Sequence, residues 1–297
     1  MQLTYVFLLI FFLFIFFYIR KKYIKYKIIY QKNGLDGILY YFKNKNFKKT
    51  GFSNFVDKKK YLLGKKISKY SNQKVLFGPY TGTKFLNLDG WTKLDFSSKY
   101  LGSYESQIQN KIIFLSKKFN LNCIVDLGAA EGYHLISLLR KKVFKKGLAY
   151  EINSKSRDIL EKNAKINKVN KKITIHKQAD FNSLKKNLDK SKINKTLFLV
   201  DIEGNEFFLF DEEFCKYFSK SFFIIEDHNF NIKNNKIKKK FYITLKKFYK
   251  FDIIENKTKN PFEYKILDKF TDDEKYLMMS EGRPETMNWI LLTPKKK

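Results

Sequence analysis

Arginine, cysteine and histidine are all scarce in this chain of 297 residues, and each shortage narrows what the protein can be. Four arginines stand against a formal net charge of +31, so lysine carries nearly all of the positive charge. Recognition of nucleic acid through phosphates and base edges favours the forked guanidinium of arginine. Lysine also comes here with much Asn, Ile, Phe and Tyr, as AT-rich codons would produce, so the charge favours codon bias over nucleic-acid binding.

The two cysteines, Cys123 and Cys215, are too few for a disulfide framework, and three histidines do not suggest a zinc site. Hydrophobic residues make up 44% of the chain, which is enough to bury a full core and excludes global disorder. The length fits one α/β domain with additions, or two small domains.

An uncharged apolar run extends from Leu3 to Ile19 and is followed by Arg20 and two lysines. As a helix it would span about 26 Å, a little less than the roughly 30 Å hydrocarbon layer of a bilayer. A cleaved signal peptide would need a basic start and a small-residue cleavage site, and a core helix would have a polar face. We therefore predict a membrane anchor with its basic flank over residues 1–22. The positive charge after it predicts that the rest of the chain is cytoplasmic.

Residues 23–102 are predicted to be a lysine- and aromatic-rich linker and lead-in region, and residues 103–297 a catalytic domain. The turn signals in VLFGPYTGTKF predict a lead-in strand or hairpin. A helix is predicted from Ser103, as its N-cap, to Phe119, with Glu105 in the first turn.

Strand-like and helix-like segments alternate through this domain, which indicates an α/β fold with a mainly parallel sheet covered on both faces. After a first strand that starts at Ile124, the predicted strands are 148–152, 173–179, 196–202, 222–225, 251–255 and 289–292. The predicted helices among them are 132–140, 154–166 and 234–249.

Five successive strands end in acidic residues, and the carboxyl ends of parallel strands lie at one edge of a sheet. The acids are Asp126, Glu151, Asp180, Asp201 with Glu203, and Glu226 with Asp227. One or two could be helix caps or solvated turn residues. Acids at five equivalent positions predict a shared acidic rim.

The segment IVDLGAAEG, residues 124–132, places a tight glycine turn between a strand and a helix. Glu151 follows at the end of the second strand, where a carboxylate can bind both hydroxyls of a ribose. The turn reads D-x-G-x-x-x-G, whereas nicotinamide cofactors are usually held by G-x-G-x-x-G. An acid before the first glycine repels a diphosphate but suits the amine and sulfonium of S-adenosylmethionine, so electrostatics favours S-adenosylmethionine over NAD.

Two motifs also resemble a known family. IVDLGAAEGYH resembles motif I of class I S-adenosylmethionine-dependent methyltransferases, and LFLVDIEGNEFFLF resembles the D-x-E-G-x-E signature of FkbM-like methyltransferases. The resemblance continues through GPYTGTKF, LGSYESQI, FFIIEDH and SEGRPETMNW, and covers the chain from about Val75 onward.

This resemblance implies a Rossmann-like methyltransferase fold, with a seven-stranded sheet whose last strand, residues 289–292, is inserted antiparallel. It implies S-adenosylmethionine as the cofactor. The residues expected to bind it are Asp126, Gly128, Ala129, Glu131, Gly132 and Tyr133 at the turn, Glu151 at the ribose, Asp180 beside the adenine, and Asp201. An alanine replaces the middle glycine of the family motif.

The expected catalytic residues are His228, Asp201 and Glu203. His228 ranks first as the general base because histidine titrates near neutrality, although it could be a hydrogen-bonded turn residue. Asp201, Glu203 and Glu206 could orient the acceptor, act as base or hold a divalent ion. No metal is expected, and Arg283 could shape a substrate wall.

Together these features predict a membrane-anchored methyltransferase that acts on oxygen of a sugar, glycolipid or other small hydroxyl-bearing acceptor, the acceptor being implied by the resemblance alone. An RNA or protein methyltransferase that uses the lysine-rich surface is an alternative. A non-catalytic membrane-bound scaffold with a methyltransferase fold is another, against which the presence of Asp126, Gly128, Glu151 and Asp201 argues.

Overall fold

The structure is a computed structural model of the chain. The residues it describes are 15–28, 30–31, 35, 55–86, 94–283 and 285–295. The chain divides into two compact units, residues 1–59 and 60–297. In the first unit residues 15–28 are helical.

Most of the predicted membrane anchor, residues 3–14, lies outside the described residues. Within the part of the chain that the structure does describe, no helix has both the length and the apolar character needed to cross a membrane. The anchor therefore stays a prediction from sequence.

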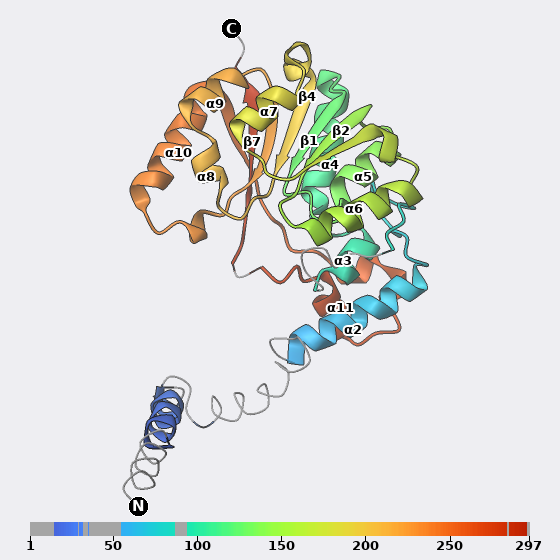
Figure 1. The fold of residues 1–297 in the computed structure, drawn as a ribbon. Helices are drawn as coiled ribbons and strands as arrows, with labels where there is room; N and C mark the ends of the chain where they lie inside the picture. The colour runs from blue at the N-terminus through green and yellow to red at the C-terminus, as the bar shows by residue number, and fades with distance from the viewer. Residues whose placement is uncertain are drawn as a thin grey trace, which may run out of the picture. The chain divides into compact units, whose positions relative to one another are not determined.

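A seven-stranded sheet forms the centre of the second unit (Figure 1). Its strands are β1 Cys123–Leu127, β2 Lys146–Tyr150, β3 Ile173–His176, β4 Thr196–Val200, β5 Phe222–Glu226, β6 Tyr249–Ile254 and β7 Trp289–Pro294. Their order across the sheet is β3-β2-β1-β4-β5-β7-β6. The strands from β3 to β5 in this order are parallel, and β7 runs antiparallel to both of its neighbours. The expected seven strands with an antiparallel last strand are confirmed.

Helices cover both faces of the sheet because successive strand residues point to opposite sides. In β1, Ile124 belongs to one hydrophobic cluster and Val125 to the other. The helices of the first cluster are α4 Ser106–Phe119, α5 Tyr133–Arg140 and α6 Ser154–Ile166. Those of the second are α7 Phe181–Asn187, α8 Glu206–Leu209, α9 Glu212–Tyr217 and α10 Asn235–Phe248.

Further helices lie beyond the end of the sheet. They are α2 Phe55–Tyr70, α3 Phe96–Leu101 and α11 Asp272–Met279, and α3 packs against α11 (Figure 1). Short 3-10 helices are η2 Asn170–Lys172, η3 Lys190–Lys195, η4 Asn229–Asn231, η5 Pro261–Glu263 and η6 Lys265–Leu267. Leu63 and Ile67 of α2 join the first cluster, so residues before 103 contribute to the core as well.

Two segments differ from the prediction. Ser103 is not a helix cap: α3 ends at Leu101 with Gly102 as its C-cap, and α4 begins only after Glu105, whose backbone is left-handed with φ 47°. The reason is that the Glu105 side chain turns away from the first turn of α4 to bind residues distant in sequence, described below. The strand predicted over 173–179 ends at His176, and Asp180 instead caps α7 by accepting the N–H of Ser183 (2.9 Å).

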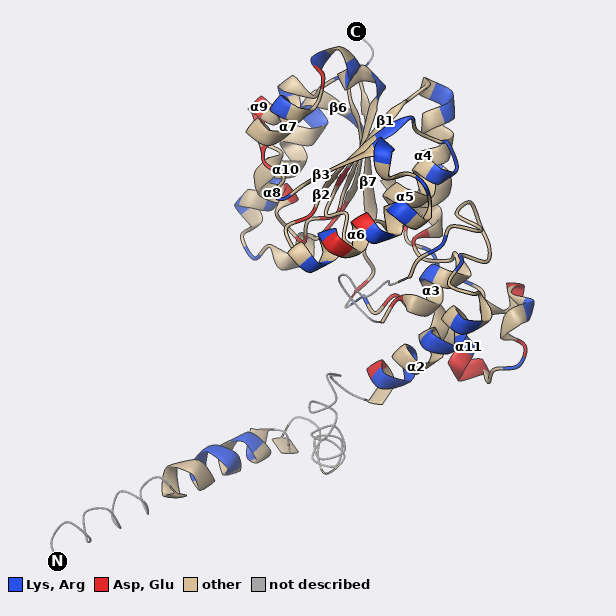
Figure 2. Ribbon diagram, turned by 45° about the vertical axis from the view of Figure 1, so that its right-hand side comes forward, with Lys and Arg blue, Asp and Glu red and all other residues tan. Residues whose placement is uncertain are grey.

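The lead-in segment forms a hairpin-like turn closed by one antiparallel bridge between Lys74 and Lys84. Figure 2 shows lysine and arginine on helices on both sides of the sheet, rather than on one element. Acidic residues lie at the lower ends of the central strands in the same view.

Candidate active site

A cavity of about 660 Å³ opens where β1, β2, β3 and β4 end. Its walls come from loops after these strands, from α8, and from the segment that enters and forms α3. The residues that line it are Asp95, Lys99, Tyr104, Gly128, Ala130, Tyr150, Glu151, Ile152, Lys177, Gln178, Ala179, Asp180, Phe181, Asp201, Ile202, Glu203, Asn205, Phe208, Leu209 and Asp211.

The glycine turn forms one side of the cavity. Gly128 has φ 87°, and a side chain there would overlap the carbonyl oxygen of Asp201, so only glycine fits. The N–H groups of Gly128 and Ala129 both donate to the carbonyl of Tyr150, at 2.8 and 3.1 Å. The turn is therefore fixed to the end of β2 and lies directly against the loop after β4.

Glu151, the expected ribose ligand, lines the cavity and also holds the glycine turn. One carboxylate oxygen accepts the N–H of Ala130 (2.9 Å), and the other accepts the N–H of Asn153 (2.7 Å). A carboxylate oxygen has a second lone pair. Both oxygens can thus accept a further hydrogen bond from a ligand in the cavity.

Several other residues expected to bind the cofactor lie behind the cavity wall. Asp126 is buried at the end of β1, and burial, with Asp201 and Glu151 nearby, raises the pKa of its carboxyl well above the usual range. Ala129 is held by its backbone bond to β2, and Gly132 starts α5 close against Leu160. None of these three contributes to the lining as the structure describes it.

Glu131 and Tyr133 are also buried outside the lining. Glu131 forms an ion pair with Lys99 (2.5 Å between Nζ and Oε1), and the Tyr133 hydroxyl donates to the carbonyl of Lys99 (3.1 Å). Both predicted residues therefore support Lys99, a cavity residue that the sequence did not single out.

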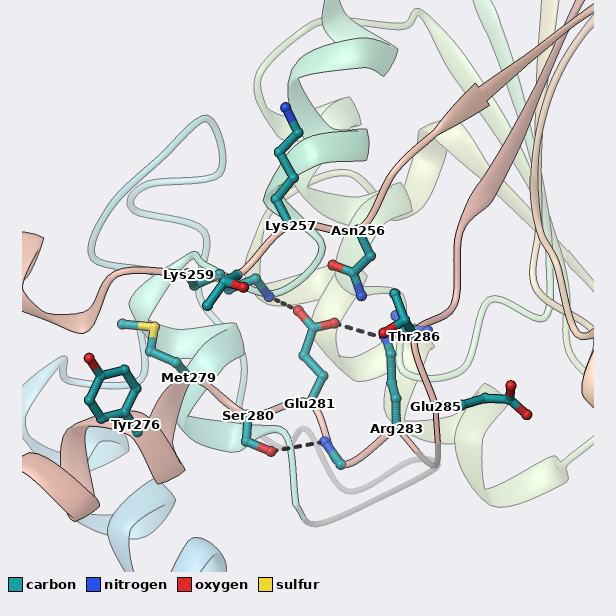
Figure 3. A pocket seen from close by; sticks show the side chains of 12 residues that line it. Asn256, Lys257, Lys259, Tyr276, Met279, Ser280, Glu281, Arg283, Glu285 and Thr286 are labelled. Atoms are coloured by element: carbon teal, nitrogen blue, oxygen red, sulfur yellow. Dashed lines mark hydrogen bonds and ion pairs between the residues drawn. The ribbon is translucent and has the colours of Figure 1, made fainter.

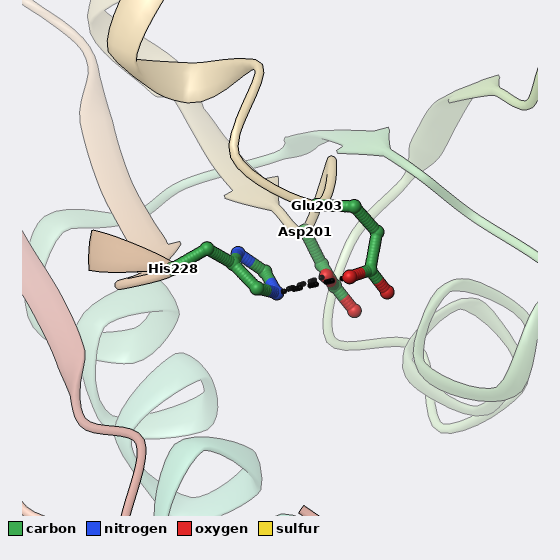
Figure 4. A group of neighbouring side chains, drawn as sticks. All are labelled: Asp201, Glu203 and His228. Carbon is green, nitrogen blue, oxygen red and sulfur yellow. Dashed lines mark ion pairs between the residues drawn. The ribbon is translucent and has the colours of Figure 1, made fainter. Parts of the chain in front are cut away.

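The three expected catalytic residues come together at the ends of β4 and β5 (Figure 4). His228 Nε2 lies 3.6 Å from Asp201 Oδ1 and 3.6 Å from Glu203 Oε2. One ligand atom from each of the three lies within 4.8 Å of the others, so the group has the composition of a cation site. Asp201 and Glu203 line the cavity, and His228 is buried beside it.

Two more carboxylates surround His228. Glu206 Oε1 lies 3.1 Å from Nδ1, and Glu226 Oε2 lies 3.2 Å from Nε2. Although burial lowers the pKa of this histidine, the hydrogen bond to Glu206 and the charges of Asp201 and Glu203 raise it above its ordinary value. Burial raises the pKa of Asp201 to about 7.

Arg283 connects the segment before β7 to the end of β5 and to the start of α4 through ion pairs. Its guanidinium pairs with Glu105, Glu226 and Glu281, and Glu105 also bonds Nε2 of His134 (2.8 Å). Glu226 therefore has Arg283 on one oxygen and His228 near the other. The charged group of Arg283 is thus bound by these carboxylates, and the substrate wall considered from sequence stays a prediction.

Arg283 also lines a second, more open hollow of about 460 Å³ (Figure 3). Lys259 pairs there with Glu281, which also binds Arg283 (3.0 Å), so the three side chains form one chain of charges. Burial lowers the pKa of Lys259 to about 8. The cations and carboxylates of this hollow largely neutralise one another.

The predicted acidic rim is divided between the cavity and its surroundings. The acids that line the cavity include Glu151, Asp180, Asp201 and Glu203. Asp227 instead accepts the hydroxyl of Tyr242 (2.8 Å). The sequence missed Asp95, Lys99, Tyr104 and Phe208, which reach the cavity from before β1 and from α8 and carry no motif of their own.

No protein-family model matches the chain, and comparison with curated proteins finds no match. Among solved structures it is similar to an O-methyltransferase from Bacillus cereus in complex with SAH, at a TM-score of 0.43 and 11% identity over 63% of this chain and 80% of that one. It is similar to the methyltransferase domain of METTL16 at a TM-score of 0.43 and 14% identity, covering 66% and 68% of the two chains.

A precorrin-6y C5,15-methyltransferase from Geobacter metallireducens gives a TM-score of 0.40 and 13% identity over 64% of this chain and 89% of that one. All three of these proteins are methyltransferases. At such scores the likenesses assign no family to this chain.

Proposed function

We propose that this protein is a class I S-adenosylmethionine-dependent methyltransferase of the FkbM-like type. Its acceptor would be an oxygen of a sugar, a glycolipid or another small hydroxyl-bearing molecule. The observation that carries the proposal is the turn at Gly128, bonded to the end of β2 beside Glu151, at the mouth of an acid-lined cavity. The sheet order with an antiparallel β7 supports it, because the motif resemblance implies that arrangement.

The cavity fits the charge of this cofactor. Asp201 Oδ1 is buried and has no hydrogen-bond partner among the described residues, and burial raises the pKa of Asp201 and of the neighbouring Asp126. Buried carboxylates are stabilised by a nearby cation, and S-adenosylmethionine carries a sulfonium and an ammonium group. The same acids would repel the negative charges of a diphosphate.

Within this proposal Glu151 holds the ribose hydroxyls, the turn at Gly128 faces the methionine side, and Asp180 lies at the adenine end. Bound S-adenosylmethionine supplies an electrophilic methyl group. The chain's contribution is to align acceptor and methyl group and to exclude water, which for a direct displacement accounts for most of the rate.

The acceptor hydroxyl must also lose its proton, and we assign that proton to Asp201. A group accepts a proton best when its pKa lies near the working pH, and the pKa of Asp201 is about 7. His228 has carboxylates near both ring nitrogens, and the hydrogen bond to Glu206 and these charges raise its pKa, which makes it less ready to take up a further proton as a base. This reverses the ranking from sequence: His228 orients Asp201 and Glu203, and Asp201 is the base.

The same acids argue against a polyanionic acceptor such as RNA. Of the cavity residues that the structure describes, Lys99 and Lys177 are the cations, against six acids. The lysines elsewhere are spread over many elements (Figure 2). A small neutral or cationic acceptor fits the charge of this cavity better than a polyanion does.

We further propose that the apolar run 3–19 anchors the protein in a membrane, with the catalytic unit on the cytoplasmic side. The support is the uncharged sequence and the lysines that follow it. An anchored enzyme of this kind would meet lipid-linked or glycolipid acceptors at the membrane surface.

The experiment that tests the function is transfer of labelled methyl groups from S-adenosylmethionine to fractionated cell extracts, with the product identified by mass spectrometry. We expect a methylated hydroxyl on a sugar or lipid-linked molecule. Tight binding of NADH without binding of S-adenosylmethionine would overturn the proposal. Methylation of RNA or protein would keep the enzyme class and reject the acceptor.

A further inference from the structure

An arginine that is mostly buried holds one of the acids that surround His228. Arg283 lies in the segment before β7, and its side chain is 13% exposed. One guanidinium nitrogen pairs with Oε1 of Glu226, while Oε2 of the same carboxylate lies 3.2 Å from Nε2 of His228. Glu226 is buried. A single buried carboxylate at the end of β5 therefore connects Arg283 to the histidine of the candidate active site.

The same guanidinium binds a second buried acid, Glu105, which is the residue before α4. Arg283 Nη2 lies 2.5 Å from Oε1 of Glu105, whose other oxygen lies 2.8 Å from Nε2 of His134. A guanidinium has five N–H donors in a fixed fork, so it can hold two carboxylates in one arrangement. Arg283 thus fixes Glu226 and Glu105, which are distant in sequence, relative to each other.

The group around His228 is rich in negative charge, and Arg283 adds a positive charge to it. Four carboxylates approach the ring nitrogens to within 3.6 Å, from the loop after β4, from α8 and from β5; they are Asp201, Glu203, Glu206 and Glu226. Burial and the nearby charge of Glu105 raise the pKa of Asp201 to about 7. The charges of His228 and Arg283 act in the opposite direction. The charge of Arg283 therefore acts on the residue assigned as the base.

We propose that Arg283 is a positioning residue for the proton transfer: it fixes Glu226 against His228 and offsets the buried negative charge around Asp201. This inference rests on the proposed function, in which Asp201 accepts the proton of the acceptor hydroxyl. Arg283 is not among the residues that line the cavity. It acts through Glu226 and Glu105 rather than on a ligand.

The first measurement is an NMR titration of the full chain, which has three histidines. Loss of a nearby cation favours the protonated form of a histidine, and loss of a nearby anion disfavours it. We therefore expect Arg283→Met to raise the pKa of His228 and Glu226→Gln to lower it. His176, which stacks on Tyr150 at the end of β3, should titrate unchanged in both variants.

The second measurement is the pH dependence of methyl transfer from labelled S-adenosylmethionine to the acceptor fraction of a cell extract. In Arg283→Met the fall of the rate at acidic pH should move upward by about one pH unit, because Asp201 loses a nearby positive charge. Arg283→Lys keeps the charge and should move it less. Binding of S-adenosylhomocysteine should be unchanged, since Arg283 lies outside the cavity lining.

Arg140→Met is the matched control, the same substitution at the exposed end of α5. It should alter neither the titration of His228 nor the pH dependence of the rate. A slower reaction in Arg283→Met with both of these unaltered would show a structural role alone and overturns the proposal. Glu226→Gln keeps the shape of the side chain and gives the answer if Arg283→Met does not fold. An unaltered pKa of His228 in Glu226→Gln overturns the proposal as well.

Failure of the proposed function gives a different result. In that case the unaltered protein does not bind S-adenosylhomocysteine. The histidine titrations need no ligand, so they report the contacts of Arg283 separately from cofactor binding.

Discussion

Glu151 combines two tasks in one carboxylate. Each oxygen accepts a backbone N–H, from Ala130 and from Asn153, while the side chain also faces the cavity. A residue of this kind fixes the shape of the turn before any ligand arrives. Its loss should therefore be visible in folding as well as in binding.

Replacing Glu151 with alanine should weaken S-adenosylhomocysteine binding by roughly 1.5–3 kcal/mol, the range for hydrogen bonds to a charged group. The free energy of unfolding should also fall, by about 1–3 kcal/mol, because two partly buried N–H groups lose their acceptor. Calorimetry and urea denaturation measure the two quantities. The control is Glu161→Ala, on the exposed side of α6. Unaltered affinity in Glu151→Ala would remove this residue from the site.

The proton acceptor can be identified from the pH dependence of kcat. A base works only when unprotonated, so kcat should fall as the pH drops through about 7, the pKa of Asp201. Asp201→Asn should lower kcat by about 10²- to 10⁴-fold and abolish this fall of kcat at acidic pH. His228→Gln should lower kcat less, and kcat should still fall as the pH drops through about 7. If only His228→Gln abolishes the fall of kcat at acidic pH, His228 and not Asp201 is the general base.

The cluster of Asp201, Glu203 and His228 also makes a prediction about metals. A histidine that carries protons on both nitrogens cannot ligate an ion, and the raised pKa of His228 favours that form. Methyl transfer should therefore be unchanged by EDTA. A loss of activity that is restored by a divalent ion would contradict this and make the cluster a metal site.

The segment between α3 and α4 shows how distant contacts override local signals. Glu105 sits in a left-handed backbone conformation because its carboxylate is bound by His134 and Arg283, which come from α5 and from the C-terminal segment. These partners keep the pKa of Glu105 at about 2, despite burial. The folded pKa is thus below the ordinary value.

A carboxyl with a depressed pKa stabilises the fold above its unfolded pKa, and this stability is lost as the pH falls through the folded pKa. For Glu105 the window runs from about 4.5 down to about 2. Glu105→Gln should lower the free energy of unfolding at pH 7 by on the order of 3 kcal/mol. It should also flatten the loss of stability in that window. A variant as stable as the parent at pH 7 would refute the assignment.

Elements whose start, end and apolar pattern are set by neighbouring residues could be predicted from sequence. Elements whose conformation depends on residues distant in sequence could not. The predicted helix 154–166 matches α6, where Asn153 caps the first turn by accepting the N–H of Ser156. The glycine turn follows from sequence because its backbone demands glycine. Lys99 could not be found in this way, since its role comes from Glu131 and Tyr104, which only folding brings next to it.

The molecule as a whole combines a compact unit, residues 60–297, with an N-terminal unit of different composition. Its net charge of +31 is spread over many helices, which favours solubility and general attraction to anionic surfaces over one specific contact. The apolar run 3–19 remains the feature that would determine where in the cell the protein is located.

We predict that the chain is anchored with its catalytic unit in the cytoplasm. In sealed inside-out vesicles a C-terminal tag should be digested by added protease, and in right-side-out vesicles it should be protected. Digestion only from the outer face would reverse the orientation. A chain that starts at Lys25 should leave the membrane fraction or be released by salt, and full retention would show that another segment anchors it.

The placement of β7 has a consequence for the order of events during synthesis. In the part of the sheet that the structure describes, β6 pairs with β7 alone, and β7 is made some forty residues later. While the chain emerges from the ribosome, β1 to β5 can assemble in turn, but β6 must wait without a partner strand. Arg283 is also made after β6, so Glu105 and Glu226 gain its guanidinium as an ion-pair partner only at that stage.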